Sequence, residues 1–399
     1  MPSRTSYDRN CDERTEEVRL AEKKLLCVFT TLLGHQTVVK RFTYALNRLP
    51  GIEPTYVLVE PEDYRRRDAP RWARWTNPWY GAFVARQKAA PVIKQRFDML
   101  LVNAWEFAVA FRDVARRMPA AAAMDCVPAT SYAQHRQNGS DGVKRWLSHQ
   151  VYHRSFARAA REFDFFLPKG TDCARALQQQ YGVASERCFV TLAPQHLDTW
   201  KPLPRNSPGP LRLLFVGNDF ARKGGDFLLR LFSNYLAGTC TLTIASNDPA
   251  LATLPLPQGV QWLPGRSRDE LLPVYREHDV FVFPTHRDFT PEVLAEALAV
   301  GLPCLASDVD GVRDLIQDGV NGFAMPRQAS MALWAARVLR LAADRAELKR
   351  ISESARRFAE DNLAFDRFQT LLADVVGRLR EQPHRVCNLD LGLSARMAR

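Results

Sequence analysis

Two acidic residues, Asp288 and Glu296, lie eight positions apart in a short stretch, DFTPEVLAEALAVG, that ends at Gly301. Glu296 stands among Ala, Leu and Val, and burying its carboxylate without a partner would cost several kcal/mol. A polar group must therefore meet it. Two acids around a helix N-terminus, at the carboxyl end of a parallel strand, would create a polar opening where α/β sheets bind ligands. The alternative is an Arg-paired Glu296 in the core and a solvated Asp288.

The segments around these acids predict a strand–helix–strand unit. An apolar run over 279–284 predicts a strand before the acids, and 303–307 predicts another after them. Thr290 is the expected N-cap of the helix between the strands, and Pro291 is its expected first residue. The helix should end at Gly301. Because the strands of such a unit run parallel, the acids should lie at the carboxyl edge of a sheet.

A second candidate site is the loop VGNDFARKGGD at 216–226, which lies between a strand-like run and a helix. Its glycines allow backbone amides to approach a phosphate closely. Arg222 and Lys223 can supply positive charge to a diphosphate. The loop is neither a Walker sequence nor a GxGxxG sequence. A solvated basic turn is the alternative interpretation.

The composition is that of a globular protein with anionic partners. The 399 residues suggest about two to three domains, 46% of them are hydrophobic, and the formal net charge is +11. This charge favours nucleotides, phospholipid headgroups or nucleic acid as partners. The eight cysteines include no CxxC pair. They therefore suggest neither a disulfide framework nor a zinc site, and they favour a reducing, cytoplasmic setting.

Alternating strands and helices predict two α/β domains, each a doubly wound parallel sheet, with a ligand cleft between them. Residues 1–22 are expected to be a polar, mobile lead. The N-terminal domain spans 23–200, with expected strands at 24–31, 55–59, 97–103, 120–124, 163–168 and 188–192. A Pro-rich linker over 201–210 leads to a second domain over 211–365. The helix over 366–380 is a candidate to pack back on the N-terminal domain, and the chain ends in a basic tail over 381–399.

Taken in order, these motifs resemble those of the retaining glycosyltransferases of the GT-B fold, family 4 (glycosyl transferases group 1). The specific part lies in the C-terminal half, in Arg222-Lys223-Gly224, Gly265-Arg266 of WLPGR, the Asp288/Glu296 helix and DGVRDLIQDGVNGF at 310–323. The N-terminal half matches more loosely, at Leu33-Gly34-His35-x-Thr37, Asp125-Cys126-Val127-Pro128 and 181–198. The resemblance covers residues 24–375.

The resemblance implies two Rossmann-like domains facing each other across a cleft. It implies a hexosyltransferase-type enzyme that moves a sugar from a nucleotide-sugar to an acceptor hydroxyl with retention of configuration. The expected setting is the synthesis of cell-surface glycans, glycolipids or related glycoconjugates, with an acceptor glycan or lipid-linked sugar. No cofactor or metal is implied, because basic side chains and a helix N-terminus take the charge of the leaving diphosphate. The expected location is cytoplasmic or peripheral on the inner face of the plasma membrane.

The resemblance also implies roles for individual residues. Glu296 would bind the nucleotide ribose and Asp288 the sugar hydroxyls, with added donors from the amides near Phe289 and Thr290. The other expected donor-binding residues are Gly217, Asn218, Arg222, Lys223, Gly265 and Arg266. The expected acceptor-side residues are Gly34, His35 and Thr37, and the expected catalytic residues are Asp125, His35, Arg222, Lys223 and Asp288.

Three positions depart from the family pattern, namely Asp288, Asn218 and Met124. The first is one methylene shorter than the usual Glu. The second replaces an Arg expected near the diphosphate, so that Arg222 and Lys223 would carry more of that charge. The third replaces the usual active-site His, which leaves His35 or Asp125 as its substitute.

The segment 64–97 is the most unusual part of the N-terminal half, because it is both basic and aromatic. It holds one acid, Asp68, against Arg65, Arg66, Arg67, Arg71, Arg74, Arg86, Lys88, Lys94 and Arg96, with Trp72, Trp75, Trp79, Tyr80 and Phe83 among them. Such a stretch suits an anionic membrane surface, where basic residues meet headgroups and Trp lies at the boundary. An insertion whose tryptophans pack on the domain is the equal alternative.

Two other classes of function stay open. One is a different GT-B enzyme, such as a sugar-nucleotide epimerase, which would turn over without any acceptor. The other is a non-enzymatic nucleic-acid-binding protein, which the charge alone suggests. The sequence contains no recognised nucleic-acid-binding module, so we expect no specific nucleic acid partner.

Overall fold

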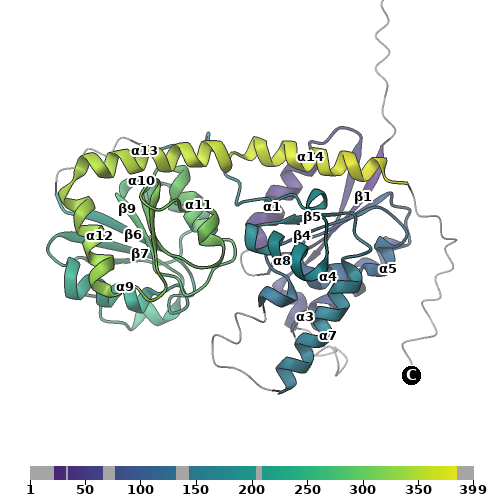
Figure 1. The fold of residues 1–399 in the computed structure, drawn as a ribbon, viewed down its shortest axis with the longest axis horizontal. Helices are drawn as coiled ribbons and strands as arrows, with labels where there is room; N and C mark the ends of the chain where they lie inside the picture. Colours follow the sequence, from purple (N-terminus) through teal and green to yellow (C-terminus); the bar gives the residue numbers. More distant parts are fainter. Residues whose placement is uncertain (1–21, 33–34, 66–76, 132–142, 204–208, 384–399) are drawn as a thin grey trace, which may run out of the picture.

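The computed structural model describes residues 22–32, 35–65, 77–131, 143–203 and 209–383. Its elements form two α/β domains that lie side by side, each built around a parallel sheet (Figure 1). None of the helices in these ranges is long and apolar enough to cross a membrane.

The N-terminal sheet has the strand order β2-β1-β3-β4-β5, with every neighbouring pair parallel. Its strands are β1 (Lys23–Thr30), β2 (Ile52–Val59), β3 (Met99–Val102), β4 (Ala120–Met124) and β5 (Phe165–Pro168). Alternate residues of β1 enter different core clusters, with Leu26 and Val28 on one face and Leu25, Cys27 and Phe29 on the other. Both faces of this sheet are therefore covered, as the continuous apolar run of β1 predicts.

Helices cover both faces of that sheet. They are α1 (His35–Leu46), η1 (Pro61–Arg65), α3 (Asn77–Ile93), α4 (Trp105–Ala110), α5 (Arg112–Ala115), α7 (Val143–Ala159), α8 (Thr171–Tyr181) and η2 (Ser185–Arg187). Helix α7 projects from the lower end of the domain in Figure 1, beside α3.

The C-terminal sheet has the order β11-β10-β9-β6-β7-β8 and is also parallel throughout. Its strands are β6 (Leu211–Val216), β7 (Cys240–Ala245), β8 (Val260–Leu263), β9 (Val280–Phe283), β10 (Cys304–Ser307) and β11 (Gly322–Met325). Its helical elements are α9 (Gly225–Leu231), η3 (Phe232–Leu236), η4 (Pro249–Ala252), α10 (Arg268–Glu277), α11 (Glu292–Ala299), η5 (Asp310–Asp314), α12 (Met331–Ala343) and α13 (Arg345–Asn362).

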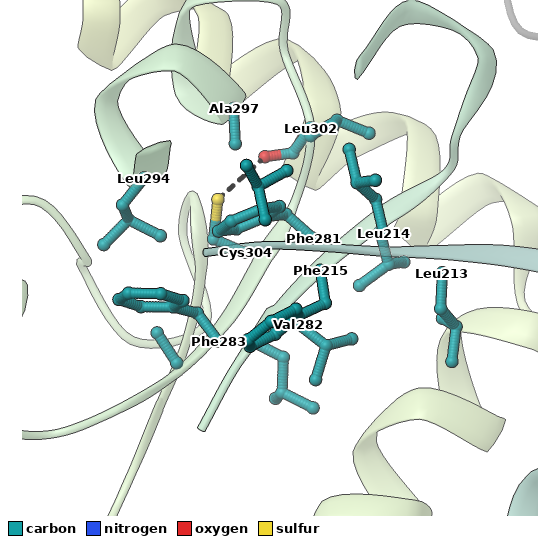
Figure 2. Packing of buried hydrophobic residues seen from close by; sticks show 14 of the residues in the cluster. Leu213, Leu214, Phe215, Phe281, Val282, Phe283, Leu294, Ala297, Leu302 and Cys304 are labelled. Atoms are coloured by element: carbon teal, nitrogen blue, oxygen red, sulfur yellow. Dashed lines mark hydrogen bonds between the residues drawn. The ribbon is translucent and has the colours of Figure 1, made fainter. Parts of the chain in front are cut away.

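The predicted strand–helix–strand unit around Glu296 is present as β9, α11 and β10. Its core is made of large apolar side chains, with Phe281 and Phe283 fully buried beside Leu294 of α11 (Figure 2). Cys304 is also buried, and its Sγ donates to the Leu302 carbonyl at 3.2 Å. This dense packing holds the carboxyl ends of the strands, and the loops that follow them, in fixed positions.

The last helix, α14 (Phe365–Glu381), belongs to the N-terminal domain although it follows the C-terminal one. Helices α13 and α14 run end to end along one side of both domains (Figure 1). The buried face of α14 joins the cluster of Leu25, Phe29 and Phe42, and the Phe42 and Phe368 rings meet edge-on with centroids 5.1 Å apart.

The two chain crossings between the domains lie side by side. The Gln195 amide donates to the Leu363 carbonyl at 2.6 Å, and the Gln195 carbonyl accepts from the Phe365 amide at 2.9 Å. The domains are therefore joined by two neighbouring strands of chain that are hydrogen-bonded to each other.

The prediction of a strand over 188–192 is wrong. Cys188 forms only an isolated bridge with Phe166, although the Thr191 amide also donates to the Pro168 carbonyl at 2.8 Å. The ladder cannot continue because Pro168 has no N–H to donate in return.

Candidate active site

Lys223 and Asp288 form an ion pair at the carboxyl ends of β6 and β9. Lys223 Nζ lies 2.9 Å from Asp288 Oδ2, and the two side chains are only 15% and 13% exposed. Gly217 makes room for the lysine, because a Cβ at that position would lie 2.4 Å from Lys223 Cδ. The structure thus brings together three of the predicted donor-binding residues, Gly217, Lys223 and Asp288, although Lys223 and Asp288 are 65 positions apart in the sequence.

Arg222 lies beside this pair but is held differently. Its Nε donates to Asp219 at 2.6 Å and its Nη1 donates to the Arg287 carbonyl at 2.9 Å. Its side chain is 40% exposed. Arg222 therefore fixes the loop after β9, whereas Lys223 presents its charge beside Asp288.

The predicted residues Asn218 and Gly265 are linked through Asn247, which the sequence analysis did not single out. Asn218 Oδ1 accepts from the Asn247 amide at 3.1 Å, and Asn247 Oδ1 accepts from the Gly265 amide at 2.5 Å. Three loops of the C-terminal domain are joined in this way. Arg266 stays apart, since its described ion-pair partner is Glu270, at 3.8 Å on the exposed start of α10.

Glu296 is 4% exposed and has the polar partners that its sequence context required. Arg268 Nε donates to Oε1 at 2.6 Å, and the buried Tyr275 hydroxyl donates to Oε2 at 3.1 Å. Burial raises the pKa of Glu296, and Arg268 opposes that rise. In this state Glu296 is the Arg-paired glutamate that the sequence left open as an alternative. Arg268 and Tyr275 were missed because only the fold brings α10 against α11.

The backbone around Asp288 is held by the neighbouring loop after β10. The Asp288 amide donates to Asp310 Oδ2 at 3.1 Å, and the Asp288 carbonyl accepts from the Gly311 amide at 3.0 Å. Gly311 is required for this close approach, because a Cβ there would lie 2.0 Å from the Phe289 carbonyl oxygen. Asp310 and Gly311 therefore position Asp288 and Phe289.

The prediction that Thr290 caps the following helix is wrong. Helix α11 begins at Glu292 with Pro291 as its N-cap, and no side chain caps it. The Glu292 amide donates to the Thr290 carbonyl at 2.8 Å instead. This turn keeps the Thr290 hydroxyl away from the helix N-terminus, where it is buried without a hydrogen-bond partner.

On the N-terminal side, His35, Asp125 and Lys169 gather at the carboxyl ends of β1, β4 and β5. His35 Nε2 lies 3.7 Å from Asp125 Oδ2, and Lys169 Nζ lies 3.4 Å from His35 Nδ1. Burial and the Lys169 cation lower the pKa of His35 to about 4, although Asp125 pulls it upward. The imidazole is therefore neutral at pH 7, and its Nδ1 accepts the hydrogen bond that Lys169 donates.

Two residues of the N-terminal domain, Lys169 and Glu106, were not predicted from the sequence as part of the site. Lys169 directly follows β5, and its place at a strand end could have identified it. Glu106, in the first turn of α4, has a pKa raised to about 7 by burial, with Asp125 adding to the rise. Thr37 is half-buried in α1, and Gly34 lies outside the described residues. Met124 is fully buried in β4.

Polar contacts between described residues join the domains across the cleft. Arg41 Nη1 donates to Glu292 Oε2 at 2.5 Å, and the Thr171 amide at the start of α8 donates to Asp314 Oδ2 at 2.8 Å. The two sets of strand ends therefore face each other, with the predicted donor and acceptor residues on opposite sides.

Comparison with known proteins agrees with this arrangement. Residues 210–344 match the family described as Glycosyl transferases group 1. A D-inositol 3-phosphate glycosyltransferase of Rhodococcus erythropolis is 26% identical over 224 residues, which are 50% of each chain. The chain thus spans about half the length of the curated relatives it matches.

Solved structures share the fold over nearly the whole chain. Sucrose-phosphate synthase from Thermosynechococcus elongatus superposes with a TM-score of 0.71 at 14% identity, over 90% of this chain and 99% of that one. HepE of Anabaena, in complex with UDP and glucose, superposes with a TM-score of 0.65 at 13% identity, over 90% and 100%. The predicted fold class is confirmed: the chain has the GT-B fold, and its residues 210–344 carry a glycosyl transferases group 1 domain.

Proposed function

We propose that the protein is a glycosyltransferase that moves a sugar from a nucleotide-sugar to an acceptor hydroxyl with retention of configuration, as a member of family 4. The observation that carries this proposal is the placement of Lys223 and Asp288 in loops at strand ends of one domain, with Glu296 in the following helix α11, facing the His35 cluster of the other domain. The group 1 match and the UDP complex of a neighbour with the same fold support it.

In the proposed donor site, each contact has a specific task. The Lys223 cation and the amides of the Gly217 loop stabilise the leaving diphosphate without a metal. Asp288 accepts hydrogen bonds from the sugar. Each oxygen of Glu296 keeps a lone pair beyond its bond to Arg268 or Tyr275, so it can still accept from the ribose hydroxyls.

The acceptor hydroxyl would lie against the N-terminal cluster. The Asp125 carboxylate accepts a hydrogen bond from it, and the leaving diphosphate takes the proton. Neutral His35 accepts from Lys169 at Nδ1 and turns its Nε2–H toward Asp125, so these two residues orient the carboxylate. An epimerase on the same fold is the competing activity, and product formation in the absence of any acceptor would favour it.

The first prediction is nucleotide binding. A uridine diphosphate sugar at about 100 times its dissociation constant should stabilise the protein by about 2.7 kcal/mol, which a thermal-shift panel of UDP-, GDP- and ADP-sugars would detect. The absence of a response to any nucleotide would contradict the proposed function.

A matched comparison tests the ribose contact within the same experiment. Replacing Glu296 with Gln should weaken nucleotide binding by about 1.5–3 kcal/mol, because a charged acceptor is lost. Wild-type protein should discriminate against a 2′,3′-dideoxy nucleotide, whereas Glu296→Gln should not. Equal discrimination by both proteins would refute the ribose assignment.

We also propose that the acceptor is a glycolipid or other cell-surface molecule and that the protein binds the membrane peripherally. The described contacts favour a membrane-binding surface other than the basic segment 64–97. Residues 66–76 of the basic segment lie outside the described ranges. In the rest of that segment, Arg86 pairs with Asp113, Lys88 pairs with Asp63, and Trp79 packs on Tyr152. These contacts favour the packed alternative for this part of the segment.

Helix α7 offers a better membrane surface. Trp146, Leu147 and Val151, in the first half of the helix, are each about half exposed. Arg154 and Arg158 follow along the same exposed stripe, and no ion pair joins either of them to a described acid. An apolar tip backed by exposed cations suits insertion at an anionic lipid surface.

The second prediction is therefore that the protein sediments with anionic vesicles at low salt. Leu147→Glu should abolish most of that binding, because it places a carboxylate in the apolar tip. Leu333→Glu, at a similarly exposed position on α12, is the matched control and should bind normally. If the wild type stays in the supernatant, the membrane proposal fails.

A further inference from the structure

Arg41 is a buried cation with unused hydrogen-bonding capacity. Its side chain, from α1, is 5% exposed, and Nη1 donates to Glu292 across the domain boundary. Its Nε and Nη2 atoms are buried and have no hydrogen-bond partner. Leaving two donors of a guanidinium unpaired in the interior is costly, so a ligand, an ordered water or another conformation is expected to satisfy them.

Arg41 lines a small pocket between the domains. Its lining is mostly apolar, with residues such as Val38 and Phe42, and its polar residues are Arg41, Lys169, Thr191, Thr290 and Glu292. The Thr290 hydroxyl is likewise buried without a partner. With two cations against one carboxylate, this lining carries a net positive charge and suits an anion.

The geometry of the guanidinium narrows the class of ligand. Nε and Nη2 form one edge of the planar fork, and that edge binds a carboxylate or phosphate through two parallel hydrogen bonds. We propose that Arg41, Lys169 and Thr290 bind a carboxylate or phosphate group of the acceptor molecule. Naming the bound molecule as the acceptor rests on the proposed transfer reaction, whereas the anion site itself does not depend on that reaction.

Access to the site requires domain motion. Because Nε and Nη2 are closed off from solvent in this conformation, the anion must enter while the domains are further apart. Domain closure would then bring Thr290, from the C-terminal domain, onto an anion already held by Arg41 and Lys169. The competing interpretation is that Arg41 serves only as an interdomain latch to Glu292.

Three variants separate these interpretations, with inorganic phosphate and acetate as probes at constant ionic strength. Arg41→Gln should weaken anion binding about tenfold or more, because a charged donor pair is lost. Glu292→Gln should leave binding unchanged or strengthen it, because it removes the one competing acid. Lys40→Gln, at the exposed neighbouring position of α1, controls for general charge and should change nothing.

The measurement is a thermal-shift titration, repeated with UDP present to occupy the donor site. An anion response that depends on Arg41 in both series supports the site, and the stronger probe identifies the group. Equal weakening by Arg41→Gln and Glu292→Gln, or by Arg41→Gln and Lys40→Gln, would overturn the proposal.

If Arg41→Gln does not fold, Thr290→Val should still weaken binding about threefold, as expected for one neutral hydrogen bond. An unchanged affinity of Thr290→Val for the anion would overturn the proposal. The UDP response of the wild type tests the proposed function separately.

Discussion

Replacing Lys223 with Met is expected to lower sugar-transfer turnover about 10²–10³-fold, the usual loss when one preorganised charge contact to a leaving group is removed. Lys223 is only 15% exposed and is held 2.9 Å from Asp288, so its charge is already positioned before the donor binds. Methionine preserves the aliphatic stem that lies against Gly217. The loss should therefore appear in kcat, with the fold intact by circular dichroism.

The matched control for Lys223→Met is Asp219→Asn. Asp219 lies in the same loop and pairs with Arg222, but its side chain is 54% exposed, and its replacement should change turnover only slightly. We propose that turnover is independent of added metal, so EDTA should leave it unchanged. Turnover that EDTA abolishes and magnesium restores, or equal losses in the two variants, would contradict this account.

Replacing Arg268 with Met is expected to destabilise the protein by about 3–5 kcal/mol at pH 7, because it leaves a buried carboxylate without its counter-ion. The carboxylate is that of Glu296, whose pKa burial already raises in the presence of Arg268. In the variant the folded pKa lies further above the unfolded value of about 4.3. The destabilisation should therefore be small below that unfolded value and should grow as the pH rises toward 7.

Urea unfolding of wild type and variant at several pH values measures this difference. Arg276→Met, on the same helix, is the control, because Arg276 donates only to the exposed Thr199 and Lys201 carbonyls in the described structure. The double variant Arg268→Met/Glu296→Gln should recover much of the stability at pH 7, since no buried charge remains. A loss that is equal at pH 4 and pH 7 would show that packing, and not charge, is what Arg268 contributes.

Local sequence was sufficient for the elements and for part of the site. The apolar runs at 211–216 and 280–283 are buried strands, and the polar loops after them hold Lys223 and Asp288. The predictions of these strands and of the polar loops both rely on sequence patterns that span only a few residues. The requirement that Glu296 must meet a polar group was likewise visible, since it depends only on burial.

The partners themselves depend on long-range packing and could not be predicted in the same way. Arg268 meets Glu296 only because α10 and α11 pack against each other. Lys169 meets His35 across 134 positions of sequence. The two wrong predictions, a strand over 188–192 and a Thr290 cap, also have non-local or geometric causes. A proline in the neighbouring strand ends the ladder at Thr191, and the turn at Pro291 keeps the Thr290 hydroxyl away from the helix N-terminus.

The path of α14 has a consequence for the order in which the chain can fold as it is synthesised. The core cluster beneath β1 contains Phe29 and Phe42, from the beginning of the chain, and Phe368 and Leu372, from near its end. During synthesis the N-terminal domain therefore emerges first but lacks one wall of its core until α14 has left the ribosome. The domain that is made first is completed last, and until then its open apolar face is a natural substrate for a chaperone.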